Sequence, residues 1–283
     1  MELFARLFSF DGIGALLSAG FVQNALIACA LLGLVAGVLA PLIVARGMAF
    51  AVHGSAELAF TGGAAALLLG ISVGIGAAAG AVIAGLFFGI LGLRQRQRDS
   101  AIGVVLGFGL GLGVLLLALY TGRASNKFGL LVGSVVSVTH EDLIALAVTA
   151  VVIIAVTGFL YRPILFSSTD PDVAIARGVP VRNLSVLFAV LVGLLTAVAV
   201  PIVGAILVLS VTITPGAAAA RVSSNPVVAT LLAFAFAETA LVGGAILSLA
   251  PGLPVSGYVA AISFAIYLCC RVLARIRQPA RML

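Results

Sequence analysis

Two ionisable side chains, His53 and Glu57, lie within a long apolar stretch of the sequence. They are four residues apart, so a helix places them on one face, a single turn from each other. An imidazole suits zinc, iron or manganese, and a carboxylate favours harder cations such as manganese. A charged group in the middle of a bilayer costs about 2.5–3.5 kcal/mol on insertion scales and usually faces a protein cavity. The pair therefore indicates a cation path, with a structural hydrogen-bonded pair and a proton relay as the alternatives.

The composition requires a membrane environment for this pair. Of the 283 residues, 63% are hydrophobic and 8% are charged, and the mean hydropathy is +1.33, whereas soluble domains carry about 25% charged residues. We expect an all-α, polytopic integral membrane protein, because the apolar runs are about 20 residues long and do not alternate as the strands of a β-barrel would. The net charge of +6 lies mostly in short connections, so nucleic acid is not an expected partner.

Nine apolar runs could cross the lipid bilayer. The seventh is interrupted by Thr212, Thr214 and Pro215, so eight spans are expected if residues 201–218 are re-entrant. The arginine-rich run 94–99 places that connection and the arginine-rich C-terminus in the cytoplasm. Residues 1–20 are expected to be an interfacial segment, and residues 21–283 a single transmembrane domain. The runs are residues 22–45, 48–69, 72–93, 101–120, 143–161, 184–200, 202–218, 226–248 and 257–274.

Other acidic residues could add to a cation path. Glu238 lies in the middle of the eighth run, and it could supply a further ligand or serve as a packing residue. His140, Glu141 and Asp142 follow the external stretch and could concentrate cations at an outer mouth. The alternative for these three residues is a solvated helix start, because Thr139 followed by Asp142 has the form of a capping box.

The cytoplasmic connection, residues 168–183, predicts a short helix at about 170–178. Asp170 or Thr169 can cap it, Pro171 suits its first turn, and Gly178 can end it. The apolar residues around Ala174 favour a docking site for another protein, with a solvated connector as the alternative. The sequence has no GxxxxGK[ST] motif, so an ATP-driven motor would be a separate chain and this chain is not expected to be an enzyme.

Several motifs together resemble the ABC-3 family of metal ABC-transporter permeases, the membrane subunits of bacterial zinc, manganese and iron importers. They are RGM at 46–48, DSAIGVVLGFG from 99, DPDVAIARGVPV from 170, VGAILVLSVTITPGAAA at 203–219 and LPVSG at 253–257. The third of these is similar to the family's coupling loop. Where the family has Asp and His in a DAxSH pattern implicated in metal binding, this chain has His53 and Glu57 in HGSAE.

The resemblance implies a homodimer of permeases in the bacterial inner membrane, with transported Zn²⁺, Mn²⁺ or Fe²⁺ and no permanently bound cofactor. It also implies cytoplasmic ATP-binding subunits that dock on Asp170, Pro171, Ala174 and Gly178, and an extracytoplasmic metal-binding protein. On this reading, ATP drives alternating access and the ion passes His53 and Glu57. Two alternatives remain, namely a permease for a metal chelate such as a siderophore, and a proton-coupled secondary transporter that uses Glu57 or Glu238.

Overall fold

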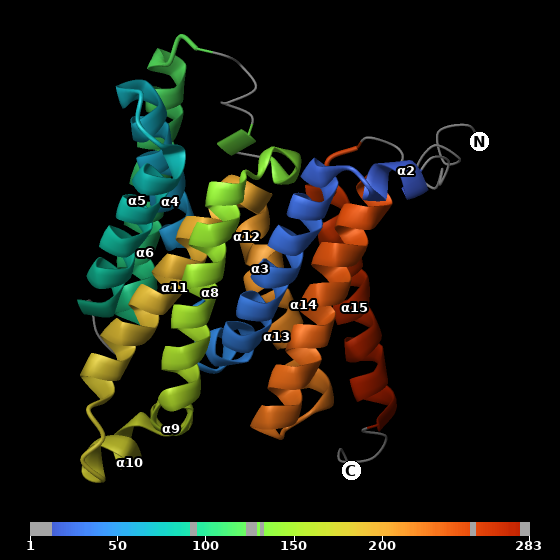
Figure 1. Ribbon diagram of the computed structural model, residues 1–283. Helices are drawn as coiled ribbons and strands as arrows, with labels where there is room; N and C mark the ends of the chain where they lie inside the picture. Colours follow the sequence, from blue (N-terminus) through green and yellow to red (C-terminus); the bar gives the residue numbers. More distant parts are fainter. Residues whose placement is uncertain (1–12, 91–94, 123–128, 131–132, 250–252, 278–283) are drawn as a thin grey trace.

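The protein is a bundle of helices (Figure 1). The structure is a computed structural model that describes residues 13–90, 95–122, 129–130, 133–249 and 253–277. The described residues contain no strand, and eight of their helices are long and apolar enough to cross a membrane. These findings confirm the all-α, polytopic fold. The eight are α3 (Gly20–Ala45), α4 (Ala49–Leu69), α5 (Val73–Ile90), α6 (Gln95–Leu119), α8 (His140–Phe159), α11 (Val181–Val203), α14 (Pro226–Leu249) and α15 (Val255–Arg277).

The predicted seventh run is a broken segment. It forms α12 (Ala205–Thr212) and α13 (Thr214–Val222), which meet at Ile213. Pro215 lies in the first turn of α13, where its missing N–H costs no intrahelical hydrogen bond. The interruption was therefore predicted correctly. The predicted end of the sixth run was wrong, since Pro201 lies inside α11, which ends at Gly204 with a φ of 86°.

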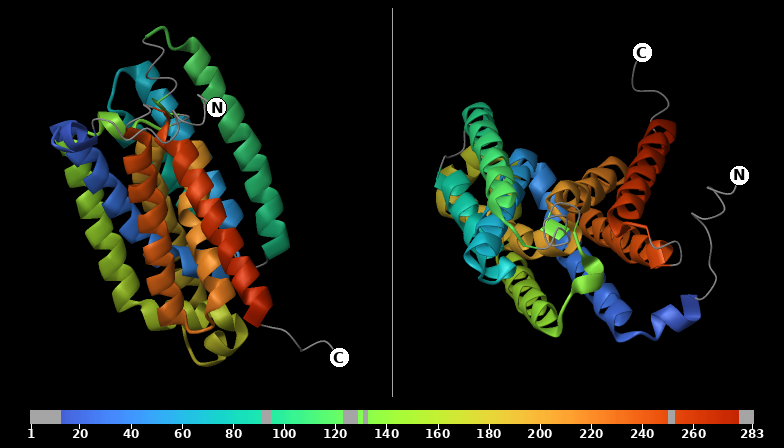
Figure 2. Two further views of the ribbon diagram at one scale, coloured as in Figure 1. Left: turned by 90° about the vertical axis from the view of Figure 1, so that its right-hand side faces the viewer. Right: turned by 90° about the horizontal axis from the view of Figure 1, so that it is seen from above.

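The bundle has two sides, which Figure 2 shows from above. On one side α4 packs against α5, α6 and α11, and on the other side α3 packs against α13 and α14, with α15 beside α13 and α14. Glycines allow the first group to approach closely. A Cβ at Gly80 would collide with the carbonyl oxygen of Leu58 on α4, and one at Gly85 would lie 2.7 Å from that of Ala189 on α11. This confirms that the glycines of the third run permit close helix contacts.

The lower end of the bundle in Figure 1 carries two short helices beside the C-terminal end of α15. They are α9 (Tyr161–Thr169), which the sequence did not predict, and α10 (Pro171–Ala176). The upper end carries α2 (Ile13–Leu17) and the 3₁₀ turn η1 (Val135–Ser137). Most of the predicted interfacial segment, residues 1–12, lies outside the described residues, as do positions 91–94 at the start of the arginine-rich run.

Candidate functional site

The helix α4, which packs against α5, α6 and α11, contains His53 and Glu57. A tight connection precedes it, because Arg46 caps α3, Gly47 has a φ of 60°, and Met48 is the N-cap of α4. Glycine adopts that left-handed conformation without the strain that a side chain would add. At 1.5 Å per residue, His53 lies about 6 Å and Glu57 about 12 Å along α4 from its start at Ala49.

The two side chains of the pair approach each other. His53 Nδ1 lies 4.0 Å from Glu57 Oε1, and 29% of the His53 side chain but only 6% of the Glu57 side chain is exposed. Within the described part of the chain, neither His53 Nδ1 nor Glu57 Oε2 has a hydrogen-bond partner, although both atoms are buried. Buried polar atoms are normally satisfied. The pair thus has the open ligand atoms that a passing cation could use.

Close packing on either side of the pair keeps α4 in place. A Cβ at Gly54 would lie 2.8 Å from the Phe88 ring of α5 and 3.0 Å from Ile102 of α6. One turn beyond Glu57, Thr61 Oγ1 lies 2.8 Å from the Glu57 carbonyl oxygen and 2.6 Å from the Gly109 carbonyl oxygen of α6. Sequence reasoning missed Thr61, although it follows Glu57 at the same four-residue spacing that singled out the pair.

Glu238 lies on the other side of the bundle. It belongs to α14, and a Cβ at Gly33 of α3 would lie 2.9 Å from Glu238 Oε1, so this carboxylate rests on the α3 backbone. The structure does not bring Glu238 together with His53 and Glu57, since the described residues contain no group of three His, Cys, Asp or Glu side chains that could hold a metal ion. A role for Glu238 in the path stays a prediction.

The predicted outer mouth lies at the upper end of the bundle. Thr139 Oγ1 accepts a hydrogen bond from the Asp142 backbone N–H, and Asp142 Oδ2 accepts one from the Thr139 backbone N–H at 3.0 Å. This confirms the predicted capping box at the start of α8. Glu141 and Asp142 also line a cavity of about 810 Å³, whereas His140 is exposed and is not part of its lining.

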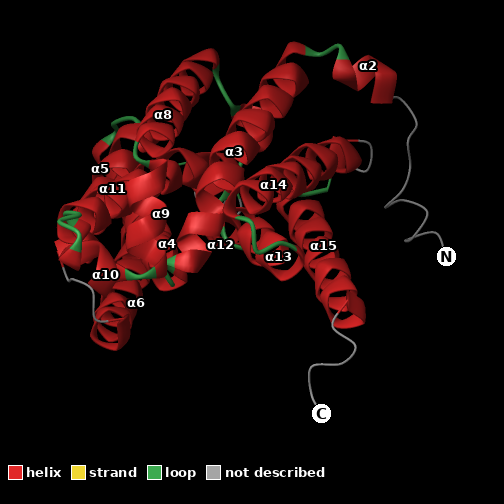
Figure 3. Cartoon of the chain, turned by 90° about the horizontal axis from the view of Figure 1, so that it is seen from below, coloured by secondary structure: helices red, strands yellow, loops and turns green. Residues whose placement is uncertain are grey.

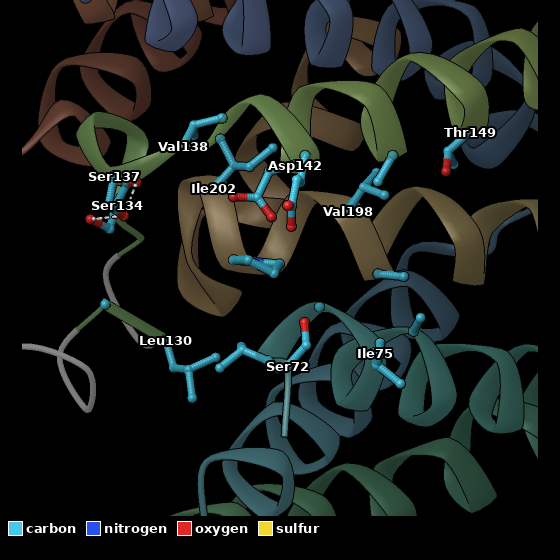
Figure 4. Close-up of a pocket in the computed structure, with 18 of the residues that line it drawn as sticks. Ser72, Ile75, Leu130, Ser134, Ser137, Val138, Asp142, Thr149, Val198 and Ile202 are labelled. Atoms are coloured by element: carbon cyan, nitrogen blue, oxygen red, sulfur yellow. Dashed lines mark hydrogen bonds between the residues drawn. The ribbon is translucent and has the colours of Figure 1, made fainter. Parts of the chain in front are cut away.

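The cavity is bounded by parts of four helices, α4, α5, α8 and α11. Figure 4 shows Asp142 of α8 beside Val198 and Ile202 of α11, with Ser72 and Ile75 at the start of α5 across the space. Its lining also includes Leu67 of α4, ten residues and thus about 15 Å along the helix from Glu57. The carboxylates of the predicted mouth therefore adjoin a hollow that reaches the same helix as the pair.

The predicted cytoplasmic helix is α10. Asp170 Oδ1 accepts a hydrogen bond from Val173 N–H at 3.0 Å, and Pro171 occupies the first turn. Gly178 has a φ of 77°, and its N–H donates to Ile175 O while Val179 N–H donates to Ala174 O. These two bonds form a Schellman motif, which stops a helix. Both predicted ends of this helix are confirmed.

The surface that α10 presents is apolar in part. Val173 and Ile175 are exposed, whereas Ala174 is fully buried and therefore fixes α10 to the bundle rather than lying on its outer surface. Seen from below in Figure 3, α9 and α10 lie at the lower end of the bundle, and α9 contacts α3 and α11. The arrangement is a stiff, capped projection at the lower end of the bundle, the end that the sequence predicts to face the cytoplasm.

A comparison with known protein families matches almost the whole chain, in agreement with the motifs, the order of the helices and the position of α10. The profile of the ABC 3 transport family matches residues 18–274. The chain belongs to this family. It is the permease subunit of a metal ABC importer, a multi-pass protein of the bacterial inner membrane.

Relatives of this permease are described as manganese transporters. It is 34% identical over 231 residues to the manganese transport system membrane protein MntC of Halalkalibacterium halodurans, which covers 81% of this chain and 79% of that protein. It is 31% identical over 204 residues to the manganese import system permease protein ScaB of Streptococcus parasanguinis, covering 70% of this chain and 71% of that one.

Two solved structures share the fold of the permease. PsaBC from Streptococcus pneumoniae in complex with Fab matches with a TM-score of 0.82 and 25% identity, over 94% of this chain and 98% of that chain. An inward-facing transporter assigned to the metal-chelate ABC type matches with a TM-score of 0.71 and 20% identity, over 89% and 85% of the two chains. The second likeness concerns the fold alone.

Proposed function

We propose that this permease carries Mn²⁺ as a free ion past His53 and Glu57, with Zn²⁺ and Fe²⁺ as the competing cargoes. The observation that carries the proposal is the buried pair with two ligand atoms, His53 Nδ1 and Glu57 Oε2, that have no partner in the described part of the protein. A site that combines a carboxylate with an imidazole suits manganese, whereas zinc is selected by softer ligand sets. The names of the manganese-transporting relatives support the same ion.

Two ligands leave most of the coordination sphere of a divalent cation unfilled. A passing ion would therefore keep part of its water or exchange it for backbone oxygens, which suits transport because a complete protein cage would hold the ion too strongly to release it. Partly exposed His53 is the accessible member of the pair, and buried Glu57 is the inner one. We assign first contact to His53 and charge compensation to Glu57.

The proposed assembly is a homodimer of permeases with two cytoplasmic ATP-binding subunits and an extracytoplasmic metal-binding protein. Each ATP-binding subunit docks on α10, whose ends are set by Asp170 and Gly178 and whose exposed apolar residues are Val173 and Ile175. ATP binding then rocks the dimer between outward and inward access. Glu141 and Asp142 lie beside the outer cavity, on the side where the binding protein delivers the ion.

The experiment is uptake of single metals by bacterial cells that lack their own manganese and zinc importers and that express the permease with its ATP-binding and metal-binding subunits. We expect manganese uptake that requires a hydrolysis-competent ATP-binding subunit. Uptake of a ferric siderophore without uptake of any free ion would instead identify a chelate permease. Manganese uptake that survives inactivation of the ATP-binding subunit would identify a secondary transporter.

A further inference from the structure

The side chain of Arg46 connects the cytoplasmic helices to the helix that carries His53 and Glu57. We propose that Arg46 is a positioning residue that transmits movement of α10 to the start of α4. The inference rests on the proposed function, because it concerns how work done at α10 reaches the cation path.

The guanidinium of Arg46 binds the last turns of α9. Its Nε donates to Ser168 Oγ at 2.8 Å, and one terminal nitrogen donates to Ser167 Oγ at 2.5 Å and to the Ile164 carbonyl oxygen at 3.2 Å. Both serine hydroxyls also donate to the Ile164 carbonyl oxygen, so the acceptors are held in place by α9 itself. The end of α9 is therefore tied to the end of α3.

The same side chain also contacts α11. The second terminal nitrogen donates to Ser185 Oγ at 3.3 Å, and the guanidinium carbon lies 4.9 Å from the centroid of the Phe188 ring. These hydrogen bonds use three nitrogens that point in different directions, which only a planar, five-donor guanidinium can supply. A lysine ammonium at this position has three donors at a single point and could not hold α9 and α11 together.

The chain connections on both sides of this contact are short. Asp170 is at once the C-cap of α9 and the N-cap of α10, so α10 cannot move without moving the end of α9. Arg46 is the C-cap of α3, and α4 begins after only Gly47 and Met48. A displacement of α10 therefore acts on the α3–α4 connection through the guanidinium, and His53 lies about 6 Å along α4 from the end of that connection at Ala49.

The test uses the assembled transporter in proteoliposomes and measures Mn²⁺ ions transported per ATP hydrolysed. Arg46→Lys keeps the positive charge but loses most of the hydrogen bonds, and we expect the ratio to fall about tenfold while ATP hydrolysis persists. The double variant Ser167→Ala/Ser168→Ala removes acceptors from α9 and leaves Arg46 in place, so it tests the link even if Arg46→Lys fails to insert. Arg221→Lys, at an exposed arginine in the last turn of α13, is the matched control and should keep the wild-type ratio.

The ratio separates a link from a merely structural role. A folding defect lowers transport and ATP hydrolysis together and leaves the ratio unchanged, and that result would overturn the proposal. So would wild-type ratios in the inserted Arg46→Lys protein or in the double serine variant, or an equal fall in Arg221→Lys. Failure of the proposed function looks different, because the wild-type assembly would then not couple manganese transport to ATP at all.

Discussion

Replacing Glu57 with Gln is the sharpest perturbation of the proposed cation path. The substitution keeps the size and shape of a side chain that is 6% exposed, and it removes the negative charge near the middle of α4. A divalent cation and a carboxylate 4 Å apart attract by about 8 kcal/mol at an effective dielectric constant of about 20, and the retained amide dipole and the water kept by the ion reduce the loss. We therefore expect Glu57→Gln to weaken binding of the ion at this position by about 2–4 kcal/mol, which corresponds to a roughly 30- to 700-fold lower affinity.

The assay is the initial rate of manganese uptake at limiting ion concentration, normalised to the amount of inserted permease. Glu57→Gln should lower this rate by at least about 30-fold. Glu57→Asp keeps the charge on a shorter side chain, so its uptake rate should lie between that of Glu57→Gln and that of the wild type. Glu238→Gln removes a second, partly buried acid that the structure places against α3, so it controls for the loss of any intramembrane carboxylate.

Unchanged uptake of manganese, zinc and iron by inserted Glu57→Gln would remove this residue from the path and refute the reasoning. An equal loss in Glu57→Gln and Glu238→Gln would place both acids on the path, despite their positions on opposite sides of the bundle. Loss of uptake together with loss of inserted protein would point to a structural role for the Glu57 carboxylate.

Two further substitutions test the docking helix and the packing of α4. Gly178→Val should reduce the ATP-binding subunit that copurifies with the permease, because a side chain at a φ of 77° costs about 1–2 kcal/mol and loosens the end of α10; normal copurification would contradict the docking assignment. Gly80→Val should lower the free energy of unfolding of the detergent-solubilised permease by about 1–3 kcal/mol, measured by thermal denaturation, because the new Cβ collides with the Leu58 carbonyl oxygen. Wild-type stability of this variant would show that α4 and α5 can separate. Gly158→Val, whose Cβ would meet no atom within 4 Å, is the control for both.

Local features of the sequence predicted the helices and their ends well where the cause is local. The capping box of Thr139 and Asp142 and the stop at Gly178 were predicted because each depends on residues within one turn. Pro201 was misread as a helix end. The prediction treated proline as a breaker, whereas the structure accommodates it in the last turns of α11. The helix α9 was missed because its short sequence reads as part of a polar connection.

The site required tertiary information to different degrees for different residues. His53 and Glu57 could be paired from their spacing alone, since a single helix sets their distance. The separation of Glu238 from the pair, the exposure of Val173 and the burial of Ala174 depend on which helices pack together. The sequence also placed Arg46 at the end of a span, yet its contacts with Ser168 and Ser185 join positions 122 and 139 residues apart.

The sequence by itself determined that this protein crosses the membrane many times as helices and carries an imidazole and a carboxylate one turn apart, because hydropathy, helix periodicity and capping are properties of neighbouring residues. Only the tertiary structure decided which side of the bundle each acid occupies, and that one guanidinium connects α9 and α11 to the α3–α4 connection. Those arrangements depend on close packing between distant helices, which glycines such as Gly80 and Gly85 permit but do not specify.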